Sequence, residues 1–192
     1  LAGGIGWDTL WGGDGRDQID ANDGFDALNG GAGDDVLFGN AGADALSGDA
    51  GMDTLYGGIN DDSLFGNDGN DHIFGDNGAD RLYGNAGTDT LSGNAGSDRL
   101  DGGGGNDVMT GGIGTDVFVF AAGQGQIYLR DFVVGQDLLK IGGWEGVADP
   151  ASLMSAARVQ SFVTASAFGV RLTLGGDVVT IKKGACPLLA QS

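Results

Sequence analysis

The sequence is poor in the residues that most often carry metal, redox or nucleophilic chemistry. Its 192 residues include one Cys, one His and two Pro, and only nine Lys and Arg against 27 Asp and Glu. One cysteine excludes a disulfide-rich scaffold, and one histidine excludes a zinc site of clustered His and Cys. Two prolines exclude a collagen-like triple helix. The net charge of −18 opposes binding to a nucleic acid backbone.

Long hydrophobic runs and targeting segments are also missing. No stretch of about 18 apolar residues occurs, so no membrane-spanning helix is predicted. The sequence starts at Leu1 without the charged and apolar segments of a signal peptide. It opens inside the repeat described below, and we therefore expect a fragment or a processed product.

Catalytic motifs are absent as well, and we predict that the chain is not an enzyme. His72 and Cys186 are the single residues of their types, and we expect a surface histidine and an ordinary structural thiol. Neither an HExxH nor a GxSxG motif occurs.

Glycine is abundant, and it follows a strict period. There are 41 Gly, and acidic, glycine-rich chains are often disordered. From Gly3 to Val119, however, the sequence divides into thirteen nonapeptides without insertion or deletion, such as GGAGDDVLF, GDAGMDTLY and GNAGTDTLS. Such a period indicates a solenoid built from stacked repeats.

Each column of the repeat has a physical interpretation. Positions 1 and 4 are Gly in twelve of thirteen copies, with Ala21 and Asn60 as the exceptions. Position 2 is Gly, Asn or Asp, which best tolerate a left-handed backbone, so we expect a tight turn there. Position 6 is always Asp, and position 8 is always apolar.

This pattern favours short strands over helices. Two or three glycines in every nine residues would each cost a helix about 1 kcal/mol. We expect each repeat to form a six-residue turn and a three-residue strand, with position 8 inward and positions 7 and 9 outward. Two repeats then make one coil, and stacked coils make two parallel sheets.

The charge is divided sharply between two regions. Residues 1–119 hold 22 acidic residues, all Asp, and three basic ones, whereas residues 120–192 hold five acidic and six basic ones. Stacking places the position-6 aspartates in two rows with steps of about 5 Å, where two carboxylates repel by about 1 kcal/mol even in water. A cation in each gap would offset this repulsion. Carboxylates and turn carbonyls are hard oxygen donors, which suit Ca²⁺ better than Mg²⁺ or Zn²⁺.

The motif GGxGxDxUx, repeated thirteen times in phase over residues 3–119, resembles the RTX nonapeptide repeat of secreted bacterial proteins. The resemblance implies an all-β fold: a parallel β-roll, that is a right-handed β-solenoid with two nonapeptides per turn. It also implies Ca²⁺ between successive coils on the same side, bound by Asp side chains 18 residues apart and by turn carbonyls. Seven repeats on one side and six on the other leave gaps for about eleven interior ions.

The implied ligands fall into two sets. The side-chain ligands form a first row of Asp8, Asp26, Asp44, Asp62, Asp80, Asp98 and Asp116, and a second row of Asp17, Asp35, Asp53, Asp71, Asp89 and Asp107. The carbonyl ligands are those of position 4: Gly6, Gly15, Gly24, Gly33, Gly42, Gly51, Asn60, Gly69, Gly78, Gly87, Gly96, Gly105 and Gly114. Ala21 and Asn60 keep their carbonyls, and we expect turn strain at Asn60.

Residues 120–192 lose the nonapeptide phase, and we predict a small β-rich C-terminal cap, because a solenoid needs its open end covered. A short helix is predicted at Ala151–Arg158, with a hairpin turn at Gly175 and Gly176. The expected strands are Val117–Phe120, Gln126–Phe132, Asp137–Ile141, Val170–Leu174 and Val178–Lys182. Asp131 and Asp137 are either ordinary loop acids or ligands of a further ion.

Aromatic residues recur at outward position 9. Phe38, Tyr56 and Phe74 are 18 residues apart and should stack on one sheet, as Phe65 and Tyr83 should on the other. Such a ladder either stabilises the sheet by cross-strand packing or contacts a glycan or a cell-surface partner.

From these features we predict a calcium-binding module that folds on Ca²⁺ binding outside the cell and serves as the secretion and folding domain of a larger protein. The resemblance implies export by the type I secretion machinery of a Gram-negative bacterium, and hence a secreted or cell-surface protein. The alternative is a structural or adhesive module of a surface adhesin or surface-layer protein. Neither nucleic acid nor a membrane span is expected.

Overall fold

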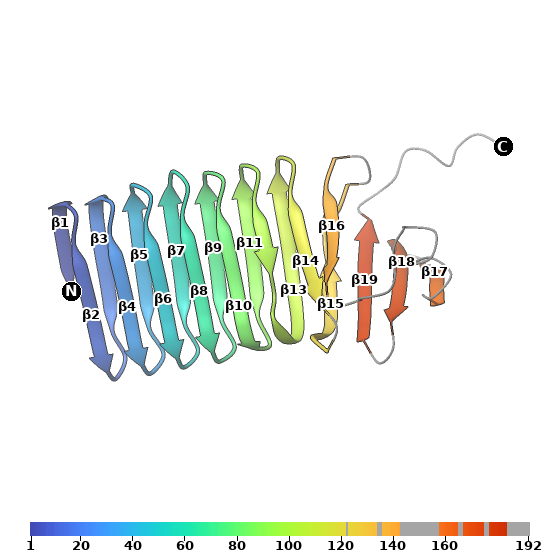
Figure 1. The fold of residues 1–192 in the computed structure, drawn as a ribbon, viewed down its shortest axis with the longest axis horizontal. Coiled ribbons are helices and arrows are strands. Elements are labelled where there is room, and N and C mark those ends of the chain that lie inside the picture. Colours follow the sequence, from blue (N-terminus) through green and yellow to red (C-terminus); the bar gives the residue numbers. More distant parts are fainter. Residues whose placement is uncertain (122, 134–135, 143–157, 165–166, 175–176, 184–192) are drawn as a thin grey trace.

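A computed structural model describes residues 1–121, 123–133, 136–142, 158–164, 167–174 and 177–183. Every regular element within these residues is a β-strand, and no helix occurs among them that could cross a membrane. The strands (Figure 1) are β1 (Ala2–Gly6), β2 (Thr9–Asp14), β3 (Gln18–Gly24), β4 (Ala27–Ala32), β5 (Val36–Ala41), β6 (Ala45–Ala50), β7 (Thr54–Ile59), β8 (Ser63–Asp68), β9 (His72–Asn77), β10 (Arg81–Gly87), β11 (Thr90–Ala95), β12 (Arg99–Asp101), β13 (Gly104–Ile113), β14 (Val117–Ala121), β15 (Gly125–Leu129), β16 (Leu138–Gly142), β17 (Arg158–Thr164), β18 (Ala167–Leu174) and β19 (Asp177–Lys183).

The repeats stack as a parallel solenoid along the long axis of the molecule (Figure 1). Each strand pairs in parallel with the strand two places further along the chain, and the paired residues are 18 apart, as for Leu28, Leu46 and Leu64. Two nonapeptides therefore make one coil, and the solenoid has about eight turns. This confirms the predicted β-roll architecture.

The strands are longer than the sequence predicts. In most coils they span six residues, because pairing continues from position 9 into positions 2 and 3 of the next repeat, as between Gly31 and Asp49 and between Ala32 and Ala50. The expected division into a six-residue turn and a three-residue strand is thus wrong. Parallel coils offer hydrogen-bond partners to the glycine-rich segment too, so it joins the ladder despite its low strand propensity.

The left-handed turn position is confirmed. The residue at position 2 has a positive φ in all thirteen repeats, with values from 70° at Asp76 to 124° at Gly4. Asn60, the one side chain at position 4, also has a positive φ, of 83°, which confirms the strain expected there.

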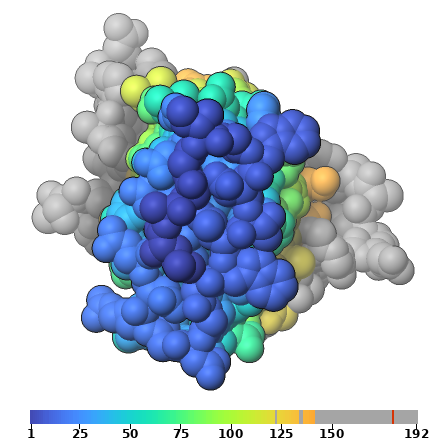
Figure 2. All heavy atoms as spheres, turned by 90° about the vertical axis from the view of Figure 1, so that its left-hand side faces the viewer, coloured from blue at the N-terminus to red at the C-terminus, as the bar shows by residue number. Residues whose placement is uncertain are grey.

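The hydrophobic core of the repeats is a column of position-8 side chains between the two sheets, and Phe120, Ile127, Leu129 and Phe132 extend it beyond them. From Ile19 to Phe118 the position-8 residues are at most 3% exposed. Leu10, in the first coil, is only partly buried. Figure 2 views the molecule from this end and shows the first coil without a covering layer, and Ile5 and Trp7 are 92% and 82% exposed.

Parallel pairing continues beyond the last nonapeptide with a changed step. Gly105 pairs with Gly125 and Val117 with Leu138, so the step lengthens from 18 residues to 20 and then 21. Strand β19 pairs in parallel with β15, and β17, β18 and β19 form an antiparallel meander.

Most strand predictions for this tail are confirmed. Gly175 and Gly176 lie outside the described residues, but Leu174 pairs with Asp177 across them, which confirms the hairpin. Strand β17 was not predicted. The predicted helix lies outside the described residues except for Arg158, the first residue of β17.

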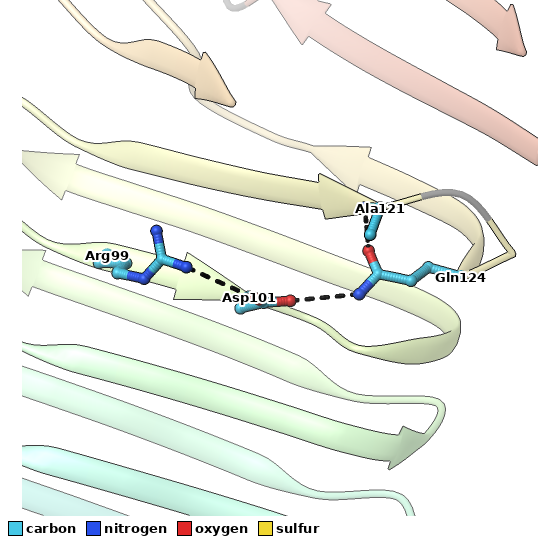
Figure 3. A network of polar contacts seen from close by, with 4 residues as sticks. All are labelled: Arg99, Asp101, Ala121 and Gln124. Carbon is cyan, nitrogen blue, oxygen red and sulfur yellow. Dashed lines mark hydrogen bonds and ion pairs between the residues drawn. The ribbon is translucent and has the colours of Figure 1, made fainter. Parts of the chain in front are cut away.

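A polar network ties the first loop of the tail to the repeats (Figure 3). The Gln124 amide donates to Asp101 Oδ1 at 3.3 Å, and its Oε1 accepts the Ala121 N–H. Asp101 also lies 3.6 Å from the Arg99 guanidinium. The side chain of Gln124 thus anchors the loop to strand β12 of the preceding coil.

Candidate metal centre

The position-6 aspartates form two buried rows, one along each edge of the solenoid. From Asp26 to Asp116 these carboxylates are at most 3% exposed, whereas Asp8 and Asp17 in the first coil are partly exposed. Position 6 directly precedes a strand in every repeat except that of Asp107, which lies within β13, and its side chain is buried beside the apolar column. Charged groups are rarely buried to this extent unless something compensates them.

One carboxylate oxygen of each aspartate from Asp26 to Asp116 has a partner within the chain. The backbone N–H of the position-6 aspartate in the preceding coil donates to its Oδ1, at 2.7 Å from Asp8 to Asp26 and 3.0 Å from Asp98 to Asp116. The same bond occurs in all eleven gaps between successive coils. The structure thus brings together the pairs that the sequence predicts.

The other carboxylate oxygen has none. Oδ2 is buried and without a hydrogen-bond partner in twelve aspartates: Asp8, Asp17, Asp26, Asp35, Asp44, Asp53, Asp62, Asp71, Asp80, Asp89, Asp98 and Asp107. Leaving one buried polar atom unpaired costs about 1–3 kcal/mol, and more when it is charged. Twelve such atoms in one small domain indicate a group that this chain does not itself supply.

Backbone carbonyls converge on the same gaps. In the gap between Asp98 and Asp116, a Cβ placed on Gly93 would lie 2.3 Å from Asp98 Oδ2 and 2.6 Å from the Gly111 carbonyl oxygen. At position 4, a Cβ on Gly114 would lie 1.4 Å from the Gly96 carbonyl oxygen. Together with Asp116 Oδ1, these oxygens give two carboxylates and two carbonyls that line one gap.

The position-1 carbonyls were missed by the sequence interpretation, which considered only position 4. The signal was present, because a position kept as Gly in twelve copies indicates close approach of another group. Ala21, the exception, keeps its carbonyl in place: its oxygen and Asp8 Oδ2 both lie within 2.8 Å of a Cβ on Gly3. The Asn60 carbonyl likewise faces Gly78 of the next coil.

Burial makes the aspartates reluctant to ionise without a cation. Desolvation, together with neighbouring carboxylates, raises the pKa of Asp62 from 3.8 to about 8, against one lowering backbone hydrogen bond. The same causes raise the pKa of Asp80 and of Asp89 to about 7. A nearby positive charge would reverse this shift.

The donor set suits a hard cation. Among the described residues, no three His, Cys, Asp or Glu side chains group together as metal ligands, so an ion would rely on paired carboxylates and carbonyls. All of these donors are oxygens, as Ca²⁺ prefers. His72 is exposed on β9, outside both rows, and Cys186 lies outside the described residues.

Asp131 and Asp137 differ from the rows. Asp131 accepts the N–H groups of Gly111 and Gly112, at 2.9 and 2.7 Å. Asp137 accepts the N–H groups of Asp116 and Val133, at 3.1 and 2.7 Å. Both oxygens of each carboxylate are therefore hydrogen-bonded, which favours a role as loop acids over that of ion ligands.

The position-9 aromatic rings stack as predicted. Tyr56 lies 5.0 Å from both Phe38 and Phe74 between ring centroids, with interplanar angles of 4° and 9°. On the other ladder, Phe65 and Tyr83 stack at 4.9 Å.

A family model matches the repeats that carry the aspartate rows. The model of the RTX calcium-binding nonapeptide repeat matches residues 2–33, 20–55, 47–82, 56–91 and 83–118. No curated protein sequence matches the chain.

Two solved structures are among those similar to the chain. The extracellular lipase LipA from Serratia marcescens is 20% identical with a TM-score of 0.49, over 96% of this chain and 37% of the lipase. The AlgE6R3 subunit of the Azotobacter vinelandii mannuronan C5-epimerase is 27% identical with a TM-score of 0.30, over 65% of this chain and 71% of the subunit. The chain thus spans little more than a third of the length of the lipase.

Proposed function

The chain belongs to the RTX calcium-binding nonapeptide repeat family, and from this premise we propose that residues 3–119 are a calcium-dependent folding module of a larger secreted protein, with residues 120–192 as its C-terminal cap. The observation that carries the proposal is the set of twelve buried carboxylate oxygens without a partner. Proteins with this repeat are typically secreted, which agrees with a module that requires external calcium.

The proposed ligands are the position-6 carboxylates of both rows and the carbonyls of positions 4 and 1. Bound Ca²⁺ supplies two positive charges and accepts six to eight oxygens in flexible geometry. Each gap offers Oδ2 of one aspartate, Oδ1 of the next and two carbonyl oxygens. About eleven filled gaps would carry about +22 against the net charge of −18.

The rows couple folding to calcium. At neutral pH the coils can close only by burying ionised carboxylates beside one another, which the single apolar column offsets poorly. The repeats therefore stay unfolded in calcium-poor cytosol, a state suited to passage through the type I secretion machinery. Outside the cell, where calcium is near millimolar, the closed coils become the stable state, because binding free energy is then folding free energy.

For the larger protein we propose an enzyme or toxin to which this module is appended as a secretion and folding domain. An adhesive or surface-layer role is the second candidate, and the stacked rings of Phe38, Tyr56 and Phe74 favour it. Both faces of the Tyr56 ring are covered by its neighbours, so a glycan would have to contact the ring edges or the ends of the stack. Pull-down on glycans or cells, with Tyr56→Ala as the control, separates these candidates.

Circular dichroism of the chain in calcium and in EGTA tests the proposal. We expect a β-sheet spectrum in millimolar calcium, its loss in EGTA and its recovery when calcium is restored. Magnesium at the same concentration should not restore it. A β-sheet spectrum that is unchanged by chelation would contradict calcium-dependent folding.

A further inference from the structure

The first row of aspartates continues one step beyond the repeats. The Asp116 N–H donates to Asp137 Oδ1 at 3.1 Å, the bond that links successive aspartates throughout the row. The two residues are 21 apart rather than 18, because the loop before β16 carries extra residues. By backbone geometry, Asp116 and Asp137 therefore enclose a further gap of the same kind.

The chain supplies its own hydrogen-bond donors around this gap. The Gly114 carbonyl, at position 4, accepts the side-chain amide of Gln136. In the interior gaps the equivalent carbonyls face the next coil beside carboxylate oxygens, as the Gly78 carbonyl does near Asp98 Oδ1. Only here among the described residues does a side-chain amide from the following loop reach a position-4 carbonyl.

The acids near this gap are compensated in the same way. Asp131 takes the N–H groups of Gly111 and Gly112, and Asp137 Oδ2 takes the Val133 N–H at 2.7 Å. Four backbone donors therefore hold two carboxylates, whereas each interior aspartate of the rows accepts one backbone N–H at Oδ1 and none at Oδ2. Backbone N–H groups stabilise the charged form of a carboxylate, as a cation would.

We propose that the gap between Asp116 and Asp137 takes no ion, and that the Gln136 amide occupies the place a cation has in the other gaps. The first row thus ends in a metal-free plug formed by Gln136 and Asp137, directly before β16. This inference rests on the proposed function, because it presumes ions in the interior gaps.

Counting bound calcium per chain by native mass spectrometry tests the plug. Asp137→Asn should leave the count of the unmodified chain unchanged, whereas the matched interior variant Asp98→Asn should lose at least one ion. Gln136→Glu replaces the amide donor with a carboxylate and should gain one ion. Gln18→Glu, at an exposed strand position, should gain none.

The outcomes separate the two proposals. If Asp98→Asn loses no ion, the calcium rows themselves are wrong. If Asp98→Asn and Asp137→Asn both lose ions, the rows stand and the plug is overturned. A Gln136→Glu count equal to that of the unmodified chain also overturns it. Circular dichroism at saturating calcium checks that each variant is folded, and Gln136→Glu keeps the test decisive if Asp137→Asn fails to fold.

Discussion

The buried aspartates of the repeats and the partly buried aspartates of the segment that follows them differ in their hydrogen-bond partners. In residues 3–119, each gap repeats the same 18-residue step, and twelve carboxylate oxygens stay buried without a partner. After Val119 the step lengthens to 20 and 21 residues, and the loops bring backbone and glutamine donors to Asp101, Asp131, Asp137 and Gly114.

This difference follows from the regularity of the repeats. A strictly periodic chain cannot place a different donor in each gap, so the same buried carboxylate oxygen lacks a hydrogen-bond partner in every coil. One type of soluble cation can then satisfy every copy. An irregular loop can satisfy its acids individually with donors of its own. The predictions below break the repeat at chosen points and compare each break with a matched site elsewhere.

The largest effect is expected from a methyl group placed between two interior coils. Gly42→Ala would put its Cβ 1.3 Å from the Gly24 carbonyl oxygen, at a φ of 140°, so the coils must separate. We expect a loss of more than about 4 kcal/mol in the free energy of unfolding, measured by urea denaturation in calcium. Gly6→Ala is the control, since it has the same repeat position and a φ of 126° but nothing within 4 Å, and it should lose only about 1–2 kcal/mol of backbone strain. Equal losses would show that conformation rather than coil contact dominates.

Removing one carboxylate from the middle of a row should rank next. Asp62 faces two gaps, one toward Asp44 and one toward Asp80, and it is fully buried. Loss of an outer-shell partner of a metal typically lowers metal affinity roughly 10–100-fold. Asp62 is proposed as a direct ligand, so Asp62→Asn should raise the calcium concentration at the midpoint of folding by at least this factor. Asp8→Asn, at the open first coil, affects only the gap toward Asp26 and should shift the midpoint less. A calcium titration followed by circular dichroism measures both, and a larger shift for Asp8→Asn would refute the proposed sharing of each aspartate between two gaps.

Acid should partly replace calcium in the repeats. Burial raises the pKa of Asp62 to about 8, of Asp80 and Asp89 to about 7, and of Asp53 to about 6, whereas these groups titrate near 3.8 in an unfolded chain. A group whose pKa is raised by folding favours the folded state below its unfolded pKa, and this contribution is lost as the pH rises through the folded pKa.

In buffer stripped of calcium, without a chelator, lowering the pH from 8 to 4 should therefore increase the β-sheet signal in circular dichroism, measured at low salt to limit screening. In calcium the trend reverses, because protons compete for the ligands, and the calcium midpoint should rise as the pH falls from 8 to 6. A metal-free chain that loses β-structure on acidification would contradict the desolvated carboxylates seen in the rows.

The sequence predicts the repeats well because their constraints are local and recurrent. The column of Leu28, Leu46 and Leu64, the left-handed position 2 and the paired aspartates all follow from the period, since each coil meets only its neighbours. The length of the strands does not follow, because glycine-rich segments gain their strand pairing from a coil 18 residues away.

The tail is less predictable because its donors are used once each. Nothing in the sequence distinguishes Gln124 or Gln136 from other surface glutamines, and their roles depend on where the 20- and 21-residue steps bring them. Strand β17 similarly depends on pairing with β18, because its residues, RVQSFVT, do not alternate strictly between apolar and polar.

The smallest expected effect concerns the aromatic stacks, where the two ladders of the roll provide an internal comparison. Tyr56 stacks on two rings and Tyr83 on one, and each stack contributes about 0.5–1.5 kcal/mol beyond burial. Tyr56→Ala should therefore lower the free energy of unfolding in calcium by about one stack more than Tyr83→Ala, as measured by urea denaturation. Equal losses would show that the rings act through burial alone. If Tyr56→Ala were neutral for stability and still abolished adhesion to cells, the stack of Phe38, Tyr56 and Phe74 would be a contact surface. Cross-strand packing would then not be its role.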